Sequence, residues 1–446
     1  MSEMMNWQQL LSDIRCGSSH QSTTRSQKER NEYDKDYGRV LFSSAFRRLQ
    51  DKTQVFPLGR NDYVRTRLTH SLEVAHIGSS LGMRAGNLLR KKRKELKSII
   101  EPSKLATIVS TACLAHDIGN PPFGHSGEDA IETALKRHDL ELPFEGNAQG
   151  FRILTRTGDP MEGKGLKLTS AVLGAFMKYP CTQSYSAAVE QGCITAINKL
   201  ECKKFGIGEQ EREAASFVAD HLGLIPRSAQ DGKNLCWCRH PLAYLMEAAD
   251  DICYRIADIE DGYFSGILDF NHVRKLFSPF LTKKELQYMK DLIQKKEESS
   301  CVHYMRALAI NKSIDAVVKT FIMYEEDLLQ GKMAKSLIET SKLADSLKKL
   351  YDDAKENVYQ SWEVIQVEAM GYKVLGELID FFMEWVNNPT SGQSKKVAIL
   401  LQAAKVFKDN EGREAREARL THMLDYISGM TDSFALETYR KLTGIL

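Results

Sequence analysis

The amino-acid sequence predicts an all-α protein. Apolar residues recur at helical spacing in the segments 68–88, 105–115 and 241–261, and nearly every segment from Lys284 to the C-terminus shows the same periodicity. Alternating patterns typical of strands occur only at 53–58 and 235–239, so we expect one or two short hairpins at most.

Composition indicates a soluble globular protein. Of the 446 residues, 42% are hydrophobic and 27% are charged. A chain of this length typically forms about three domains. The 61 basic residues nearly balance the 59 acidic ones, so the net charge is +2 and any anion-binding site must be local. The N-terminal MSEMMNWQQL lacks the apolar region of a secretory signal, and the apolar stretch 105–115 is too short to span a bilayer. We expect a cytoplasmic protein without membrane contact.

The nine cysteines show no CxxC spacing, and a cytosolic protein is expected to keep them reduced. Cys236, Cys238 and His240 lie close enough in the sequence to suggest a zinc site. Further ligands at zinc-finger spacing are missing, so reduced cysteines are the favoured interpretation.

The first predicted helix, 68–88, carries His70. His76 lies six positions later, roughly on the opposite side of the helix, which makes it a poor partner for His70 in a shared site. The basic run RKKRKELK at 90–97 is typical either of nucleic-acid binding or of a solvated helix end and loop, and the second interpretation is favoured. The apolar stripe of this helix consists of Leu68, Leu72, Ala75, Leu81, Ala85 and Leu88.

The second predicted helix, 105–115, is followed directly by His116 and Asp117. This apolar helix delivers the adjacent pair into the rigid turn Gly-Asn-Pro-Pro at 119–122. An adjacent histidine and aspartate at the end of an apolar helix have few structural reasons to exist. We therefore interpret His116 and Asp117 as metal ligands.

The third predicted helix, 241–261, supplies a distal aspartate. Asp250, Tyr254 and Asp258 are spaced i, i+4, i+8 and share one face, whereas Asp251 projects about 100° away. This face suits a pocket wall, so we assign Asp250 to the metal and Asp251 to a supporting role. Together with His70, His116 and Asp117, Asp250 completes a ligand set for one divalent metal that keeps positions open for water or phosphate.

His125 and Glu128 follow the proline turn, three residues apart. A carboxylate beside a histidine stabilises the imidazolium form, which suits a proton donor to a leaving alkoxide. We interpret the two residues as a catalytic pair. The alternative is a glutamate at a helix N-terminus with an incidental histidine.

Several long motifs in the chain resemble those of one known family, the deoxyguanosine triphosphate triphosphohydrolase (dGTPase) family of the HD-domain phosphohydrolase superfamily. These motifs span residues 47 to 432, and they are RRLQDKTQVFPLGRNDYVRTRLTHSLEV, HDIGNPPFGHSGE, FEGNAQGFRIL, MEAADDICYRIADIED and DYISGMTD.

The resemblance implies an HD-domain helical fold with additional C-terminal helices. It divides the chain into an N-terminal segment, 1–65, that contributes to the active site, and an HD metal-binding catalytic domain, 66–255. A C-terminal helical region, 256–446, would complete the nucleotide pocket and supply oligomer contacts. The implied assembly is a homo-oligomer, a hexamer by resemblance, and single-stranded nucleic acid is an implied effector.

The implied reaction splits a dNTP into deoxynucleoside and inorganic triphosphate with Mn²⁺ or Mg²⁺, or with Co²⁺ or Fe²⁺, as cofactor. The resemblance assigns His70, His116, Asp117 and Asp250 to the metal and His125 with Glu128 to catalysis. The implied substrate contacts are Gln54 and Asp258 at the sugar 3′-OH, Tyr254 under C2′, Asn147, Lys178 and Tyr179 on the phosphate side, and Val55, Tyr359 and Glu368 in the base pocket.

The resemblance favours dGTP as the substrate, because Glu368 can accept hydrogen bonds from guanine N1 and N2. Other dNTPs stay open, because the stretch between Glu128 and Phe144 is short compared with dGTP-selective members. Two other functions are alternatives. One is an HD-type phosphodiesterase or 5′-nucleotidase with the same metal. The other is a helical nucleic-acid-binding scaffold that uses the basic run 90–97, and the intact ligand set with His125 and Glu128 argues against it.

Overall fold

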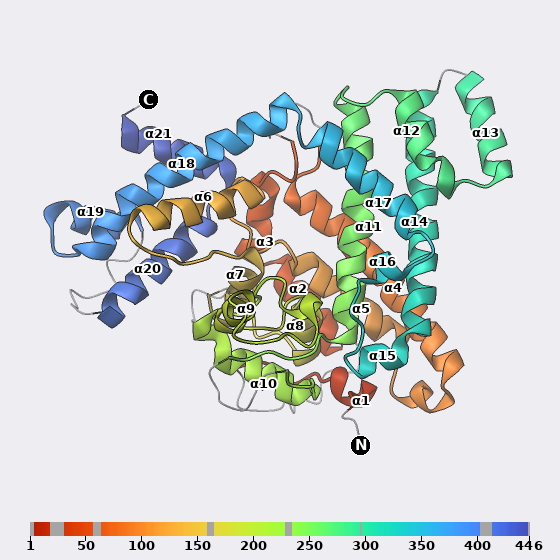
Figure 1. Cartoon of the computed structure of the whole chain (residues 1–446), viewed down its shortest axis with the longest axis horizontal. Helices are drawn as coiled ribbons and strands as arrows, with labels where there is room; N and C mark the ends of the chain where they lie inside the picture. Colours follow the sequence, from red (N-terminus) through yellow and green to blue (C-terminus); the bar gives the residue numbers. More distant parts are fainter. Residues whose placement is uncertain are drawn as a thin grey trace.

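A computed structural model describes residues 4–17, 31–56, 64–157, 165–227, 234–294, 297–401 and 413–444 as a helical protein (Figure 1). These residues include no β-sheet, which confirms the all-α prediction. The two predicted strand segments contribute only isolated bridges, Thr53 with Thr66, Cys181 with Cys236, and Pro226 with Trp237. Residues 57 and 58 lie outside the described residues. No helix in the described part of the chain is both long and apolar enough to cross a membrane.

The N-terminal half of the chain forms eleven α-helices within these ranges. They are α1 Trp7–Leu10, α2 Glu32–Leu41, α3 Ser44–Arg48, α4 Arg67–Lys92, α5 Pro102–Ala115, α6 Gly124–Arg137, α7 Gly146–Arg152, α8 Ser170–Phe176, α9 Gln183–Glu190, α10 Arg212–Leu222 and α11 Pro241–Phe264.

The remaining α-helices follow in the C-terminal half. They are α12 Phe270–Phe277, α13 Lys283–Gln294, α14 Glu298–Met323, α15 Glu325–Leu329, α16 Leu337–Thr340, α17 Ala344–Asp353, α18 Trp362–Asn387, α19 Gly392–Leu400, α20 Arg413–Ser428 and α21 Asp432–Thr443.

Helices α4, α5 and α11 pack against one another and form the centre of the molecule, with α14 against α4 and α11. Local sequence sets where each helix begins. Thr66 forms a capping box with Thr69 at α4, Pro102 occupies the first turn of α5, and the His240 side chain caps α11 directly before Pro241. The first residues of α4, α5 and α11 thus follow from capping signals that the sequence contains.

The predicted apolar faces of α5 and α11 are buried, but the predicted stripe of α4 is wrong at Leu72, which is 40% exposed. The face of α4 toward α5 instead carries Gly78, Gly82 and Gly86. A Cβ atom at Gly82 would lie 2.7 Å from the Leu105 carbonyl oxygen. Apolar periodicity missed this face, because its close packing depends on small residues.

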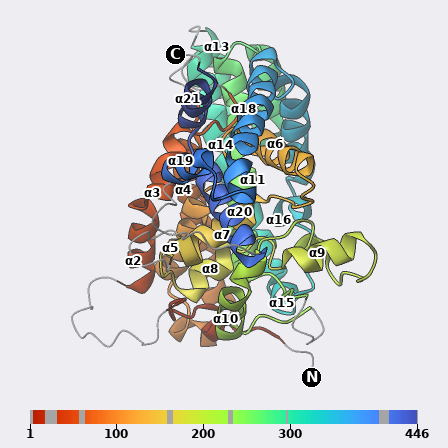
Figure 2. The same ribbon diagram turned by 90° about the vertical axis from the view of Figure 1, so that its left-hand side faces the viewer.

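A second, smaller core lies beside the bundle (Figure 1). It joins α6 to α18, α20 and α21, and Figure 2 shows α18 running alongside α6 from a second direction. Helices α12 to α17 share the large core with the bundle. The predicted boundary between residues 255 and 256 falls inside helix α11. It therefore divides the chain by proposed functional role and not by structural unit, and it stays a prediction.

The basic run 90–97 lies at the end of α4 and in the following 3₁₀ turn. Lys92 and Arg93 approach the buried carboxylate of Glu325, at 3.0 and 3.4 Å. This placement agrees with the favoured interpretation of the run as a helix end and loop.

Gly119 tests how tightly the turn after α5 is packed. A Cβ atom there would lie 2.0 Å from the Gly146 carbonyl oxygen and 2.1 Å from the Gly150 nitrogen. Gly119→Ala is therefore expected to cost about 3 kcal/mol or more of stability, measured as a fall in Tm. Gly392→Ala is the control, because its Cβ atom would meet nothing within 4 Å. Equal melting temperatures for the two variants would contradict this packing.

Candidate active site

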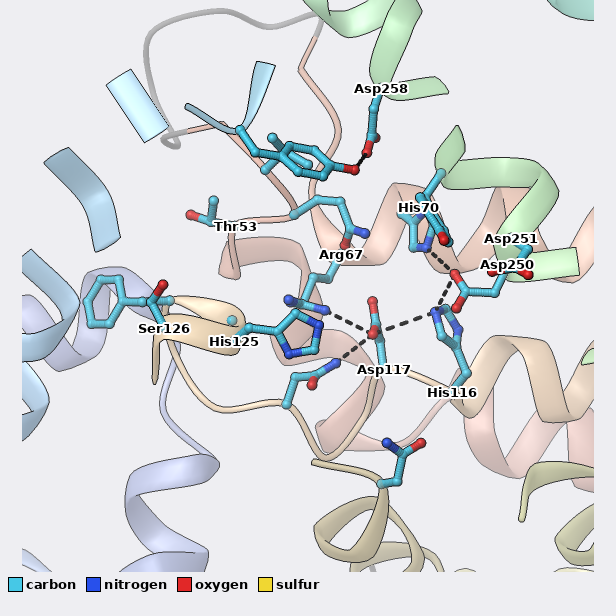
Figure 3. A pocket seen from close by; sticks show the side chains of 18 of the residues that line it. Thr53, Arg67, His70, His116, Asp117, His125, Ser126, Asp250, Asp251 and Asp258 are labelled. Carbon is cyan, nitrogen blue, oxygen red and sulfur yellow. Dashed lines mark hydrogen bonds and ion pairs between the residues drawn. The ribbon is translucent and has the colours of Figure 1, made fainter. Parts of the chain in front are cut away.

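A cavity of about 460 Å³ lies where the helical bundle meets the start of α18. Figure 3 shows side chains from α4, α6 and α11 pointing into it. Each predicted site residue lines this cavity except Glu128, which lies behind His125. Residues from positions 53 to 368 of the chain therefore converge on one volume. The lining residues with predicted roles are Gln54, Val55, His70, His116, Asp117, His125, Asn147, Lys178, Tyr179, Asp250, Tyr254, Asp258, Tyr359 and Glu368.

His70, His116 and Asp250 form a compact group with the spacing of a metal site. One ligand atom of each lies within 4.8 Å of the other two, and among the described residues no other His, Cys, Asp or Glu group has this spacing. The Asp250 Oδ1 atom lies 3.2 Å from His70 Nε2 and 3.6 Å from His116 Nε2 (Figure 3).

The alternative of a zinc site at Cys236, Cys238 and His240 is wrong in this structure. Both ring nitrogens of His240 are already engaged, Nε2 by the Leu10 carbonyl and Nδ1 by the Leu242 amide.

The orientation of His116 suits a ligand role. Its Nδ1 atom lies 2.6 Å from the Cys113 carbonyl oxygen. A carbonyl oxygen can only accept, so Nδ1 carries a hydrogen, and Nε2 is the ring nitrogen that faces Asp250 and could bind a metal. The bond to the Cys113 carbonyl therefore fixes the direction of the ring.

Asp117 adjoins the same group and has one oxygen to spare. Its Oδ1 atom accepts from Arg67 Nη1 at 2.9 Å and from Asn120 Nδ2 at 2.5 Å, and lies 3.5 Å from His116 Nε2. Its Oδ2 atom is buried without a hydrogen-bond partner. Buried carboxylate oxygens are normally bonded, so an orphan beside two histidines fits a bound cation.

Asp250 and the adjoining Asp117 are both held ionised. Burial alone would raise the pKa of Asp250, but His116 and His70 hold that pKa well below its ordinary value. Burial also acts to raise the pKa of Asp117, but Arg67, His116 and His70 together outweigh it and lower the pKa. The neighbouring Asp251 differs. Burial raises its pKa to about 6 despite Arg255, which lies 3.3 Å away.

The turn after Asp117 places His125 at the mouth of the cavity. Phe123 adopts a left-handed conformation, with φ of 63°, directly before α6. His125 Nδ1 lies 3.0 Å from Glu128 Oε2, and Glu128 Oε1 accepts the Gly146 amide at 2.8 Å. Burial acts to raise the pKa of Glu128, but the hydrogen bond from His125 and the charge of Lys204 lower it. Glu128 is thus an ionised, fixed partner for an exposed imidazole.

Lys178 and Tyr179 form the opposite wall, supported by buried charges. Lys178 Nζ lies 3.6 Å from Glu247 Oε1, and Glu247 Oε2 accepts from the fully buried Arg239 at 2.8 Å. The Arg239 guanidinium also lies over the Tyr179 ring, 5.4 Å from its centroid. Burial would lower the pKa of Lys178, but Glu247 raises it, so the ammonium group stays charged.

The end of the cavity beyond Asp250 carries Asp258, Tyr359 and Tyr254. The Tyr359 hydroxyl donates to Asp258 Oδ2, so this predicted base-pocket residue also contacts the predicted sugar-binding carboxylate. Burial raises the pKa of Asp258 to about 7. Gln54 Oε1 is buried without a hydrogen-bond partner, which leaves it available to a ligand.

Sequence reasoning missed several polar residues of this cavity, among them Arg67, Asn120 and Lys204. Arg67 and Asn120 both hold Asp117, and Lys204 Nζ lies 2.8 Å from Glu145 and 3.7 Å from Glu128. Arg67 lies one helical turn before His70, so its spacing could have identified it. Lys204 lies in a distant segment without regular periodicity, and no sequence signal indicates it.

Comparison with known proteins agrees with this geometry. Residues 67–170 match the HD domain family, and residues 338–441 match the phosphohydrolase-associated domain. Similar proteins include a deoxyguanosinetriphosphate triphosphohydrolase-like protein of Synechocystis, 40% identical over 99% of this chain and 100% of the relative. Proteins with the same name from Pseudomonas aeruginosa and Listeria innocua are 36% and 30% identical, each over 99% of this chain and at least 99% of the relative. The chain therefore belongs to the deoxyguanosinetriphosphate triphosphohydrolase-like family of HD-domain phosphohydrolases.

Proposed function

We propose that this phosphohydrolase is a metal-dependent dNTP triphosphohydrolase that converts dNTPs, with dGTP preferred, to deoxynucleoside and inorganic triphosphate. The observation that carries the proposal is one cavity that brings together a metal-type group, the cationic side chains of Arg67, Lys178 and Lys204, and the acceptor groups of Asp258 and Gln54. The names of the relatives support the same substrate class.

The residues present fit a divalent metal ion. His70, His116 and Asp250 would hold it together with Asp117, whose Oδ2 atom is buried and unpartnered. When bound, such an ion supplies Lewis acidity and neutralises charge at an α-phosphoryl group. Two imidazole ligands favour Mn²⁺, Fe²⁺ or Co²⁺ over Mg²⁺ in affinity, and Mn²⁺ or Mg²⁺ is our proposal for the working ion.

The side chains around the metal group suit the triphosphate. Lys178 is charged and directed by Glu247, and Arg67 and Lys204 line the same cavity. Charge-assisted hydrogen bonds from such groups bind phosphate oxygens and offset charge that develops during displacement at the α-phosphorus. Asn147 and Tyr179 complete the proposed phosphate contacts.

In the proposed hydrolysis a water molecule forms a bond to the α-phosphorus while the bond to the 5′-oxygen breaks, and protonation of that leaving oxygen falls to His125. Its imidazole is exposed at the cavity mouth, and the ionised Glu128 holds its Nδ1 atom. With Nδ1–H bonded to the carboxylate, Nε2 is the atom directed to a substrate, and in the imidazolium form it can donate a proton to the departing alkoxide.

The far end of the cavity suits a deoxynucleoside. Asp258 and Gln54 present acceptor atoms to a 3′-hydroxyl. The Tyr254 ring, proposed to lie under C2′, is packed edge-on against Tyr351 and contacted by Arg255. Val55 and Glu368 line the same cavity, where a carboxylate favours guanine. Assembly as a homo-oligomer such as a hexamer, a single-stranded nucleic-acid effector and a cytoplasmic location remain proposals from family resemblance.

The test is incubation of purified protein with Mn²⁺ and each of the four dNTPs, and separately GTP, in ¹⁸O-labelled water. We expect deoxynucleoside and inorganic triphosphate that carries one ¹⁸O atom, dGTP as the preferred substrate, and little turnover of GTP. Release of monophosphate or pyrophosphate would instead support the HD-type phosphodiesterase or 5′-nucleotidase alternative.

Two histidines on α4 give a matched test of the metal site. His70→Ala is expected to weaken Mn²⁺ binding by at least about 100-fold and to abolish turnover, because a direct ligand matters more than its outer-shell partners. His76→Ala is the control, since His76 is exposed on the same helix. Metal affinity is measured by titration with electron paramagnetic resonance detection. Equal affinity in both variants would refute the ligand assignment.

The raised pKa of Asp258 predicts a pH dependence of sugar recognition. Above about pH 7 the ionised carboxylate accepts a strong hydrogen bond from the 3′-hydroxyl, and below it the neutral acid is a weaker acceptor. The ratio of KM for a 2′,3′-dideoxy-NTP to KM for the matching dNTP should therefore rise with pH between pH 6 and 8. Titration of the triphosphate cancels in this ratio. In Asp258→Asn the ratio should stay constant, and an unchanged slope would exclude Asp258 as the contact.

A further inference from the structure

We propose that Asp432, near the C-terminus, is a positioning residue that holds the sugar-binding and proton-donating parts of the active site in register. The kinetic part of this inference rests on the proposed function. It concerns two segments of the cavity wall, 52–55 and 120–125, which lie far apart in the sequence. Both segments are hydrogen-bonded to the same C-terminal segment, 428–432.

The Asp432 carboxylate joins the two segments directly. Its Oδ2 atom accepts the Thr53 amide at 2.9 Å and the Thr53 hydroxyl at 2.6 Å, and its Oδ1 atom accepts the Phe123 amide at 3.0 Å. The side chain is buried, with 6% of the residue exposed. One carboxylate therefore satisfies three donors, two on one segment and one on the other, and both of its oxygens are used.

The residues that Asp432 holds lie directly before predicted substrate-binding and catalytic residues. Thr53 precedes Gln54 and Val55, and Phe123 lies two residues before His125. Phe123 has φ of 63°, a conformation that a phenylalanine keeps only where its surroundings enforce it. The bond to its amide is such a restraint. It fixes the start of α6, from which the exposed His125 side chain projects.

Lys52 adds a parallel tie. Its buried Nζ atom donates to the Asn120 carbonyl oxygen at 2.5 Å and to the Ser428 carbonyl oxygen at 2.7 Å. Asn120 in turn donates to Asp117, a member of the predicted ligand set. The segment 428–432 thus braces the whole turn from Asp117 to His125 against the segment that carries Gln54.

Asp432 itself does not line the cavity and contacts none of the predicted metal ligands in the described structure. Its loss should therefore leave the metal group intact and disturb the alignment of His125 with the sugar end. This separates a positioning role from a general contribution to folding, which would reduce metal binding and catalysis together.

The test compares Asp432→Asn with wild type in the full-length protein. Asparagine keeps the shape but turns an amide NH₂ toward donors. We expect kcat for dNTP hydrolysis to fall about 10- to 100-fold, because small misplacement of a reacting group costs rate on this scale. Mn²⁺ affinity should stay within about twofold. Asp380→Asn is the matched control, since Asp380 ties the far end of α6 to α18 through Arg137 and His138, and it should retain wild-type kcat.

Hydrogen exchange supplies a readout that does not depend on the reaction. In Asp432→Asn, peptides containing the Thr53 and Phe123 amides should lose protection by about tenfold or more, while peptides from α5 and α11 stay protected. If wild-type protein releases no triphosphate, the proposed function fails and this exchange pattern still decides the inference. Unchanged protection at both amides, or wild-type kcat in Asp432→Asn, would overturn it.

Thr53→Val keeps the inference testable if Asp432→Asn fails to fold. It removes only the hydroxyl bond to Asp432 and retains the amide bond. We expect a smaller loss of kcat in the same direction, with Mn²⁺ affinity unchanged, and recovery in Thr53→Ser, which restores a hydroxyl. Equal kcat in all three proteins, or loss of kcat and metal affinity by the same factor, would also overturn the inference.

Discussion

The convergence of two histidines and two aspartates at one point of a helical bundle is the constraint on which this structure depends. His70, His116 and Asp250 come from α4, from the end of α5 and from α11, the three helices that form the centre of the molecule. Buried carboxylates are costly unless they are paired or coordinate a cation. Asp117 keeps one buried oxygen without a partner. The packing of these helices therefore leaves a negative charge that a bound cation would neutralise.

The surrounding charges form an ordered set around that point. Arg239, Glu247 and Lys178 make a buried chain that ends on one wall of the cavity, and Arg67 with Asn120 directs Asp117 from the other side. Each charged group is directed by a neighbour that does not itself need to touch a ligand. Such preorganisation means that little reorientation is needed when a polyanionic substrate binds.

Sequence predicted the helical class and the apolar faces of α5 and α11, because those faces are made of large side chains at regular spacing. It failed at Leu72 of α4, because the part of this helix that packs closely on α5 carries glycines, which a periodicity of large residues does not detect. His70, His116 and Asp250 could be predicted because the motifs around them are specific. The contacts of Lys204 and Asp432 could not, because they join segments hundreds of residues apart or lie in irregular chain. The predicted roles of the cavity residues, beyond their placement together, stay predictions.

The most direct measurement of the central claim is anomalous-scattering diffraction from crystals of the full-length protein grown with Mn²⁺. The account predicts a single manganese peak within bonding distance of His70 Nε2, His116 Nε2 and carboxylate oxygens of Asp117 and Asp250. No peak at that position, with the Asp250 side chain turned away from the two histidines, would contradict it.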